Sequence, residues 1–233
     1  MHEPSALEVE TFQATPGAPD AAVVLCHGYG APADDLAGLG PELVRAQPSL
    51  SRTRFYFPAA PLDLGFGRAW WPIDMLAVQR LQGDPEALRE FRKQEPAGLP
   101  AARAKLHKLV RDIADDTGLP MHRLALGGFS QGAMLACDVT LRLEEAPATL
   151  LVLSGTLLTE ETWRAKAAAR AGLPVFQSHG RFDPVLPFVA AEWLRDLLTE
   201  AGLPVEFVPF DGAHTIGQEA FTRLGDFLAR RLR

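Results

Sequence analysis

The sequence has few cysteines and no long hydrophobic run. Its two cysteines, Cys26 and Cys137, are too few for a disulfide framework or a structural zinc site, and we expect both to be small buried hydrophobic residues. The longest purely apolar stretches, such as residues 21–26 and 150–153, have the length of a β-strand. A helix that crosses a bilayer needs about 20 apolar residues. The sequence therefore predicts a protein without integral membrane contact.

Long basic runs are also missing. The formal net charge is −6, and adjacent basic residues occur only in pairs such as Arg92-Lys93 and Arg230-Arg231. A surface that tracks a phosphate backbone is basic, so we expect no nucleic-acid partner. The N-terminal residues do not form a positively charged segment followed by a long apolar one, which is the pattern of a secretory signal. The expected location is the cytoplasm.

Strand-like apolar runs alternate with helix-periodic segments along all 233 residues, of which 47% are hydrophobic. This alternation is typical of an α/β domain whose mostly parallel central sheet has helices on both faces. Several runs are almost entirely apolar, as expected of strands that are covered on both faces. We expect one domain, residues 1–233. The predicted strands are residues 22–26, 54–57, 124–126, 150–153, 175–178 and 205–210, with an additional edge strand near residues 7–12.

Amphipathic segments lie between these strands. Apolar residues recur with helical spacing in two segments, and the tripeptide Gly-Leu-Pro at 118–120, 172–174 and 202–204 precedes a predicted strand each time. Glycine favours the end of a helix and proline prevents its continuation, so these tripeptides predict helix-to-strand connections. The apolar stripes are Leu106, Leu109, Val110 and Ile113 in one helix and Phe221, Leu224, Leu228 and Leu232 in the last one.

Residues 58–100 fit the alternation least well. Prolines and glycines interrupt the chain around Trp70 and Trp71, and the polar residues 79–94 predict a solvated helix that is followed by a loop at 96–100. A segment of this length between two core elements is usually functional. We expect residues 62–100 to form a lid or the wall of a cleft; the alternative is a surface excursion without function.

A short motif places one serine on a sharp turn. Residues 128–132 read Gly-Phe-Ser-Gln-Gly between an apolar strand and a helix-tolerant segment, which is the Gly-x-Ser-x-Gly pattern of a nucleophile elbow. The two glycines allow the neighbouring backbones to approach and hold the serine in a strained conformation. Ser130 is therefore the predicted nucleophile. The pattern is short enough to arise by chance, so its context decides.

A serine nucleophile needs an imidazole base and a carboxylate that orients this base. In proteins with such an elbow both lie on loops after later strands, in the order serine, acid, histidine. Asp183 and His214 each follow a predicted strand in this order, so we expect a catalytic triad of Ser130, Asp183 and His214. Asp211 is the alternative acid, but it would have to fold back sharply to reach the same ring.

Acyl transfer also needs hydrogen-bond donors for the negative oxygen of the tetrahedral intermediate. We expect the backbone N–H of Gln131, at the start of a helix, and that of Tyr29, in the loop after the first buried strand. We expect His27 to orient the loop that contains Tyr29. We expect His179 to pack beneath the acid loop, which is the loop that carries Asp183. Apolar residues on strand-end loops are candidates for the acyl pocket, although each could equally belong to the core: Trp71, Leu158 and Leu186.

Together these segments resemble the phospholipase/carboxylesterase group of the α/β-hydrolases, which includes acyl-protein thioesterases. The glutamine after the serine and the His-Gly-x-x-Asp-x-Val-x-Pro acid loop make the resemblance specific. Two features depart from the family pattern: Pro72 within the tryptophan segment, residues 70–74, and the long polar stretch 79–100. The resembling segments are residues 25–30, 57–61, 70–74, 128–132, 179–187 and 212–214.

The resemblance implies the α/β-hydrolase fold and a serine esterase or thioesterase without metal or organic cofactor. The expected substrate is a small-molecule carboxylic ester with a short- to medium-chain acyl group, cleaved through an acyl-enzyme. Alternatives that remain open are an acyl-protein thioesterase or lysophospholipase, a serine peptidase, and a non-catalytic binding module. A monomer and a homodimer are both compatible with the sequence.

Overall fold

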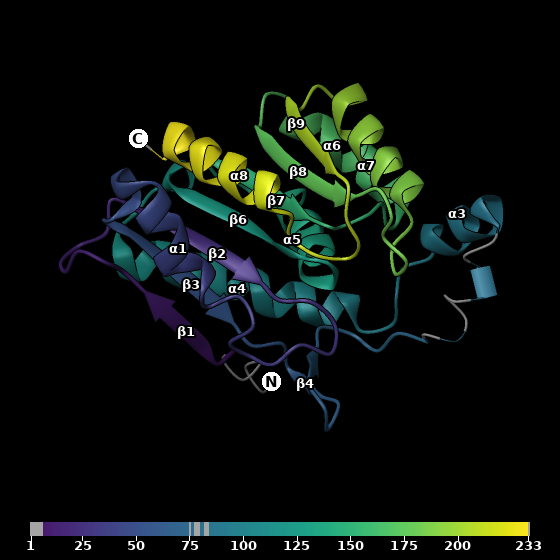
Figure 1. Ribbon diagram of the computed structural model, residues 1–233, viewed down its shortest axis with the longest axis horizontal. Helices are drawn as coiled ribbons and strands as arrows, with labels where there is room; N and C mark the ends of the chain where they lie inside the picture. The colour runs from purple at the N-terminus through teal and green to yellow at the C-terminus, as the bar shows by residue number, and fades with distance from the viewer. Residues whose placement is uncertain (1–6, 75, 77–79, 82–83, 233) are drawn as a thin grey trace.

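A seven-stranded sheet forms the centre of the protein (Figure 1). The computed structural model describes residues 7–232 except 75, 77–79, 82 and 83. The strand order is β1-β3-β2-β6-β7-β8-β9; β1 pairs antiparallel with β3, and every other neighbouring pair is parallel. The strands are β1 (Val9–Phe12), β2 (Ala21–Cys26), β3 (Thr53–Pro58), β6 (Leu124–Phe129), β7 (Thr149–Leu153), β8 (Val175–Gly180) and β9 (Val205–Phe210).

Helices cover both faces of this sheet, as the α/β pattern predicts. In Figure 1, α1 and α8 lie in front of the sheet, whereas α4 and α5 lie behind it. The helices are α1 (Leu39–Ala46), α3 (Pro85–Lys93), α4 (Leu99–Thr117), α5 (Gln131–Thr140), α6 (Glu160–Ala167), α7 (Phe188–Glu200) and α8 (Gln218–Arg231). Short 3₁₀ turns are η1 (Pro48–Leu50), η2 (Met121–Arg123) and η3 (Ala168–Arg170).

Two apolar layers hold the helices to the sheet. Successive strand side chains point to opposite faces, so the fully apolar strand β2 contributes to both layers. Val23 and Leu25 belong to a cluster with Leu224 of α8, whereas Val24 belongs to a cluster with Leu106 of α4. This double burial explains why β2 has apolar residues at every position rather than at every second one.

The helix-to-strand connections agree with the sequence. Gly118 ends α4 with φ 68°, and Gly172 and Gly202 also have positive φ after η3 and α7. The residue after each glycine is a buried or half-buried leucine, and proline then leads into the next strand. Glycine is favoured here because a left-handed backbone conformation strains residues that carry a Cβ atom.

The segment between β3 and α4 differs from the sequence-based expectation in two respects. The loop predicted at 96–100 is too long, because Gly98 caps α4 and Leu99 and Pro100 already form its first turn, where proline needs no N–H partner. Within the range 79–94, for which one helix was predicted, the structure has α3 (Pro85–Lys93), which begins after the N-cap Asp84. Residues 79, 82 and 83 of this range lie outside the described part. α3 is not fully solvated, since Leu88 is buried.

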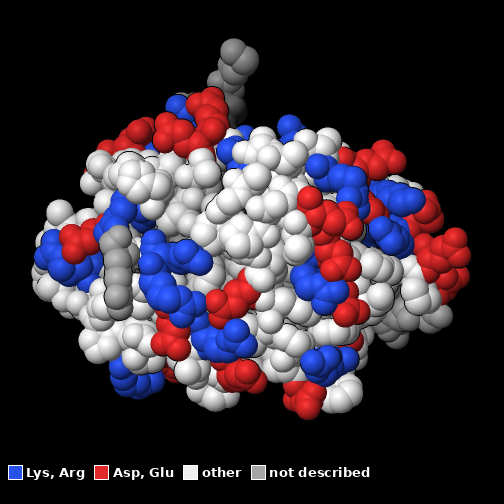
Figure 2. All heavy atoms as spheres, turned by 90° about the horizontal axis from the view of Figure 1, so that it is seen from above, with Lys and Arg blue, Asp and Glu red and all other residues white. Residues whose placement is uncertain are grey.

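This segment also contains a two-stranded hairpin, β4 (Leu62–Asp63) and β5 (Arg68–Ala69). α3 lies at the right-hand edge of the molecule in Figure 1, away from the sheet. Among the described residues, no helix combines the length and the apolar composition that a membrane span needs. The face shown in Figure 2 carries basic and acidic side chains that are interspersed around an uncharged central area.

Candidate active site

Ser130 lies on the sharp turn between β6 and α5. Its backbone has φ 55° and ψ −119°, a conformation that costs about 1–3 kcal/mol for a residue with a side chain. The flanking glycines make the turn possible: a Cβ atom at Gly128 or Gly132 would lie 2.4 or 2.1 Å from the carbonyl oxygen of Cys26. The backbone of β2 at Cys26 therefore lies directly against the two glycines on either side of Ser130.

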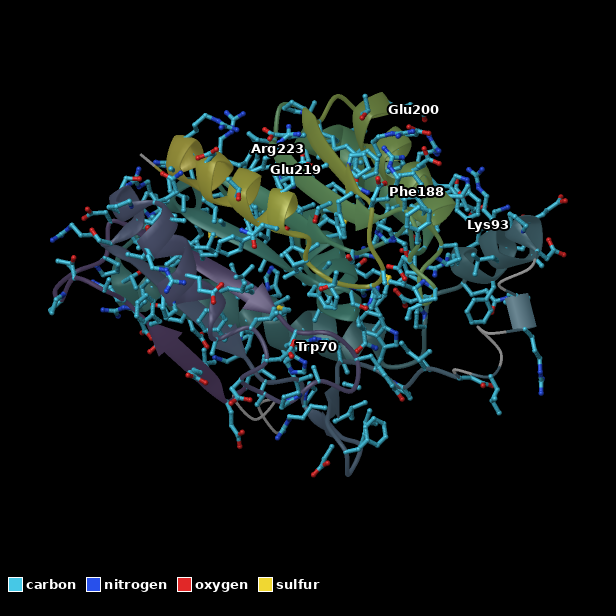
Figure 3. All side chains as sticks on the ribbon, viewed as in Figure 1. Trp70, Lys93, Phe188, Glu200, Glu219 and Arg223 are labelled. Carbon is cyan, nitrogen blue, oxygen red and sulfur yellow. The ribbon has the colours of Figure 1, made fainter. Side chains whose placement is uncertain are left out.

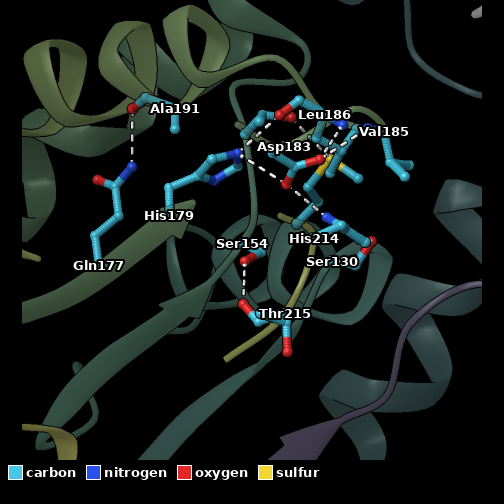
Figure 4. A network of polar contacts seen from close by, with 12 residues as sticks. Ser130, Ser154, Gln177, His179, Asp183, Val185, Leu186, Ala191, His214 and Thr215 are labelled. Carbon is cyan, nitrogen blue, oxygen red and sulfur yellow. Dashed lines mark hydrogen bonds and ion pairs between the residues drawn. The ribbon is translucent and has the colours of Figure 1, made fainter. Parts of the chain in front are cut away.

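The structure brings the three predicted catalytic side chains together (Figure 4). His214 Nε2 lies 2.9 Å from Ser130 Oγ, and His214 Nδ1 lies 2.6 Å from Asp183 Oδ2. Asp183 follows β8 and His214 follows β9. The carboxyl ends of parallel strands meet at one edge of a sheet, which is why residues 31 and 84 positions apart in sequence are in contact.

Asp183 is buried and accepts several hydrogen bonds. Its Oδ1 accepts the backbone N–H groups of Val185 and Leu186, each at 2.8 Å, and His179 Nε2 lies 3.2 Å from Oδ2. Burial alone would raise the pKa of Asp183, but the hydrogen bonds from His179, His214 and Leu186 outweigh it and hold the pKa below its usual value. The carboxylate therefore stays ionised beside the imidazole.

The alternative acid Asp211 and the neighbouring His179 have other partners. The Asp211 side chain is 79% exposed and pairs with Arg181 at 3.4 Å. His179 is fully buried beneath the acid loop, and its Nε2 lies 2.8 Å from the carbonyl of Leu186. Both neighbours of His179 Nε2 are acceptors, so this nitrogen donates. His179 thus supports Asp183 and does not contact Ser130 through any described hydrogen bond.

Ser154, which was not predicted from the sequence, holds the loop that carries His214 in place. The Ser154 hydroxyl donates to the carbonyl of Thr215 at 2.9 Å (Figure 4), and the Phe129 ring lies 4.9 Å from the His214 ring. Ser154 directly follows β7 and has φ 49°. The only signal available in the sequence was its position at a strand end, which many residues share.

Both predicted oxyanion donors line the same cavity as Ser130. Neither the N–H of Tyr29 nor that of Gln131 makes a hydrogen bond within the described part of the chain. The loop with Tyr29 passes close to the elbow, since a Cβ atom at Gly28 would lie 3.3 Å from Ser130 Cβ. The two amides are thus free to donate to an oxygen that enters the cavity.

The side chain of Gln131 has a function that was not predicted. It is fully buried, its Oε1 accepts the N–H of Trp70 at 2.9 Å, and its Nε2 donates to the carbonyl of Trp71 at 2.8 Å. The residue after the serine therefore ties the tryptophan segment to the elbow. A buried amide with both ends satisfied also restricts the rotation of its own backbone.

His27 orients its loop, in the way the sequence suggested. Its Nε2 accepts the N–H of Ala60 at 3.0 Å, its Nδ1 donates to the carbonyl of Gly28 at 2.8 Å, and its own carbonyl accepts the indole N–H of Trp70 at 2.9 Å. Burial lowers the pKa of His27, which favours the neutral ring that this pattern requires. The loop with Tyr29 is therefore joined both to the segment that follows β3 and to Trp70.

A cavity of about 520 Å³ opens onto Ser130 and His214. The three predicted pocket residues, Trp71, Leu158 and Leu186, all line it. Met134 and Arg92 line it too and were not anticipated. Met134 lies one helical turn after Ser130, a spacing that could have indicated it, whereas Arg92 was hidden in a polar stretch that predicted a solvated helix.

The arrangement has the parts needed for acyl transfer. Ser130 Oγ can pass its proton to His214 Nε2 while Nδ1–H faces the Asp183 carboxylate, and Tyr29 and Gln131, whose N–H groups have no acceptor among the described residues, line the same cavity. This geometry suits nucleophilic attack on an acyl carbonyl.

Comparison with known proteins agrees with this geometry. Residues 8–232 match the family model described as Phospholipase/Carboxylesterase. A protein from Neurospora crassa named acyl-protein thioesterase 1 is 31% identical over 221 residues, which cover 91% of this chain and 87% of that protein. A second acyl-protein thioesterase 1, from Gibberella zeae, is 26% identical and covers 91% of each chain.

Solved structures show the same architecture. The crystal structure of esterase PE8 superimposes with a TM-score of 0.82 and 31% identity, over 97% of this chain and 100% of the other. A carboxylesterase from Mesorhizobium loti, at 18% identity and a TM-score of 0.73, covers 97% and 99% of the two chains and shares the fold. The chain belongs to the phospholipase/carboxylesterase family and is a serine hydrolase of esters or thioesters with the α/β-hydrolase fold.

Proposed function

We propose that the protein is a carboxylesterase that cleaves short- to medium-chain acyl esters through an acyl-enzyme on Ser130. The observation that carries the proposal is the continuous hydrogen-bonded chain from Ser130 Oγ to His214 and from His214 to Asp183, at 2.9 and 2.6 Å. Such a chain activates a hydroxyl that is otherwise a poor nucleophile.

In the proposed reaction, His214 removes the proton of Ser130 as its Oγ attacks the ester carbonyl. The carbonyl π electrons move to the oxygen, which accepts the N–H groups of Tyr29 and Gln131; each such donor contributes about 3 kcal/mol of transition-state stabilisation. The protonated His214 then gives its proton to the departing alcohol. Water, deprotonated by His214, then attacks the acyl carbonyl; the bond between the acyl carbon and Ser130 Oγ breaks, the acid is released, and His214 returns its proton to Ser130.

The cavity supports a compact acyl group. Trp71, Leu158 and Leu186 are all less than 10% exposed and give it an apolar wall. We propose that the segment 62–100 contributes a wall of this cleft, because its described residues 71–74, 91, 92 and 94–97 line the cavity. A volume of about 520 Å³ is in the usual range of small-molecule sites.

A fluorophosphonate probe and a series of p-nitrophenyl esters test this proposal. The probe should label Ser130, and kcat/KM should pass through a maximum at a short or medium acyl chain. The Ser130→Ala variant should lose labelling and nearly all turnover. Unimpaired hydrolysis by this variant would sink the assignment of the nucleophile.

A second candidate is a thioesterase that acts on acylated proteins, and it is favoured by the relatives named acyl-protein thioesterase 1 at 25–31% identity. The same triad can cleave both acyl donors, so the leaving group must be compared directly. Matched oxygen esters and thioesters of one acyl chain, and an S-acylated peptide, distinguish the two. A kcat/KM at least tenfold higher for the peptide than for the small ester would favour the thioesterase.

A further inference from the structure

Arg92, on α3, is buried with part of its guanidinium unused. Only 6% of the surface of Arg92 is exposed to solvent. Nη1 donates to the hydroxyl of Thr156 at 2.5 Å and to the carbonyl of Leu157 at 3.3 Å. Nε is buried without a hydrogen-bond partner, and Nη2 has none among the described residues. One edge of the guanidinium, formed by Nε and Nη2, is therefore without an acceptor.

No counter-charge compensates this arginine. Among the described residues, no carboxylate lies within 4.0 Å of Arg92, although burial of an unpaired charge destabilises a fold. Burial lowers the pKa of Arg92 to about 10, so the side chain remains charged at neutral pH. Two other arginines use the same edge. Arg52 donates from Nε and Nη2 to both carboxylate oxygens of Asp20. Arg89 donates in the same way to Glu160.

Arg92, whose Nε and Nη2 have no acceptor among the described residues, is part of the wall of the cavity that contains Ser130. Arg92 lines this cavity, whereas the adjacent Lys93 lies exposed at the periphery (Figure 3). Thr156, which Arg92 contacts, lies 3.6 Å from the sulfur of Met134. Met134 is four residues after Ser130 on α5, a rise of about 6 Å along the helix. Arg92 and Ser130 thus line one cavity and are connected through Thr156 and Met134.

Two acidic residues also line the cavity, and neither pairs with Arg92. Glu95 accepts a hydrogen bond from Arg103 Nη2 at 2.6 Å, so its charge is already balanced. Asp74 is the other acidic residue of the lining. Met134 and Leu158 are among the apolar residues of the lining.

We propose that Arg92 forms an anion-binding subsite for a carboxylate at the far end of the acyl chain. Preferred substrates are then half-esters of aliphatic dicarboxylic acids, whose methylene groups contact Met134 and Leu158 while the free carboxylate binds the Nε/Nη2 edge. A planar carboxylate matches this edge with two parallel hydrogen bonds. The acyl side is assigned because Arg92 binds the carbonyl of Leu157, next to Leu158 of the acyl pocket. This inference rests on the proposed esterase function.

Monoethyl adipate and its primary amide, in which –CONH₂ replaces the free carboxylate, test the subsite. The two esters have the same length and differ in charge, and ethanol release gives kcat/KM for each. The wild-type protein should prefer the half-ester about tenfold, which corresponds to about 1.4 kcal/mol. Arg92→Met should bring this ratio close to one. Arg89→Met, which removes a guanidinium from the same helix outside the cavity, should keep it.

The outcomes separate the subsite from the esterase activity. A wild-type ratio at or below one, or an unchanged ratio in Arg92→Met, overturns the subsite. A preference for an ester with the carboxylate on its alcohol side overturns the assignment to the acyl chain. If Arg92→Met does not fold, the wild-type ratio and its decrease with added salt decide. Failure of the esterase function would appear differently, as absent turnover of p-nitrophenyl acetate and absent fluorophosphonate labelling.

Discussion

The Nε2 group of Gln131 donates to the backbone carbonyl of Trp71 at 2.8 Å, which joins the residue after the nucleophile to the wall of the cavity. Trp71 lines the cavity and is 2% exposed, so its backbone position decides the shape of the acyl pocket. The backbone N–H of Gln131 has no acceptor among the residues that the structure describes. Gln131 thus connects the proposed oxyanion position to the cavity wall.

Replacing Gln131 by leucine should reduce both stability and kcat/KM. The N–H of Trp70 and the carbonyl of Trp71 would lose their partners, and each unsatisfied buried group costs about 1–3 kcal/mol. Urea unfolding and hydrolysis of p-nitrophenyl acetate measure the two effects. Gln177→Leu is the matched control, because Gln177 is equally buried and binds Ala191 outside the cavity. Full kcat/KM in a folded Gln131→Leu protein would contradict this coupling.

Asp183→Asn should reduce kcat by about 10³–10⁴-fold with little change in the position of the loop, because an amide can favour the wrong tautomer of His214. The rival acid provides the control: Asp211 is exposed and paired with Arg181, so Asp211→Asn should retain activity within about twofold. Steady-state kinetics with one short-chain ester compares the two variants. Equal losses in both would show that neither carboxylate is specific to the triad.

The stability of the protein should depend on the ionisation of Asp183 at acid pH. Its folded-state pKa is depressed below the ordinary value of 3.8, so the folded state binds fewer protons than the unfolded one in this range. The stabilisation is complete above the unfolded pKa and is lost as the pH falls through the folded pKa. The difference in unfolding free energy between wild type and Asp183→Asn should therefore be constant from pH 7 to about pH 5 and shrink toward pH 3.

Urea unfolding at pH 7, 5, 4 and 3 measures this difference. The same measurement on Asp211→Asn should give a difference that changes little with pH, because that side chain is solvated. Parallel stability curves for wild type and Asp183→Asn across the whole range would argue against the depressed pKa.

Gly132→Ala should destabilise the protein and abolish activity. The added Cβ atom would lie 2.1 Å from the carbonyl oxygen of Cys26, so β2 or α5 would have to move. Gly38→Ala is the control, since its Cβ atom would meet nothing within 4 Å and its φ is −62°. Thermal unfolding and probe labelling of Ser130 report the two effects. A stable, fully labelled Gly132→Ala protein would refute the close approach of β2 to the elbow.

The sequence was sufficient for the fold and for the contacts among Ser130, Asp183 and His214 because both depend on local patterns. Apolar runs define the parallel strands, and topology then brings the strand-end loops to one edge. Asp183 could be preferred over Asp211 for the same reason, since its loop follows a different strand from that of His214. Residue types at strand ends therefore carried most of the information about the site.

Side-chain partners across long distances in sequence were not predictable. Nothing near Ser154 indicates that it binds Thr215, 61 residues later. Arg92 lies in a polar stretch that resembles any solvated helix, and only packing against the loop after β7 reveals its burial. The start of α4 was misplaced because proline usually ends helices, whereas Pro100 occupies a first turn in which its missing N–H has no cost.

The 84-residue separation between Ser130 and His214 has a consequence for folding. The elbow can form from β2, β6 and α5, but the base arrives only when β8, β9 and their loops have joined the sheet. Closing loops of this length is slow compared with forming helices. We therefore expect esterase activity to return last during refolding, after fluorescence and circular dichroism have reached native values. Turnover would then report the fraction of molecules that have reached the native fold, and compact intermediates would not contribute to it.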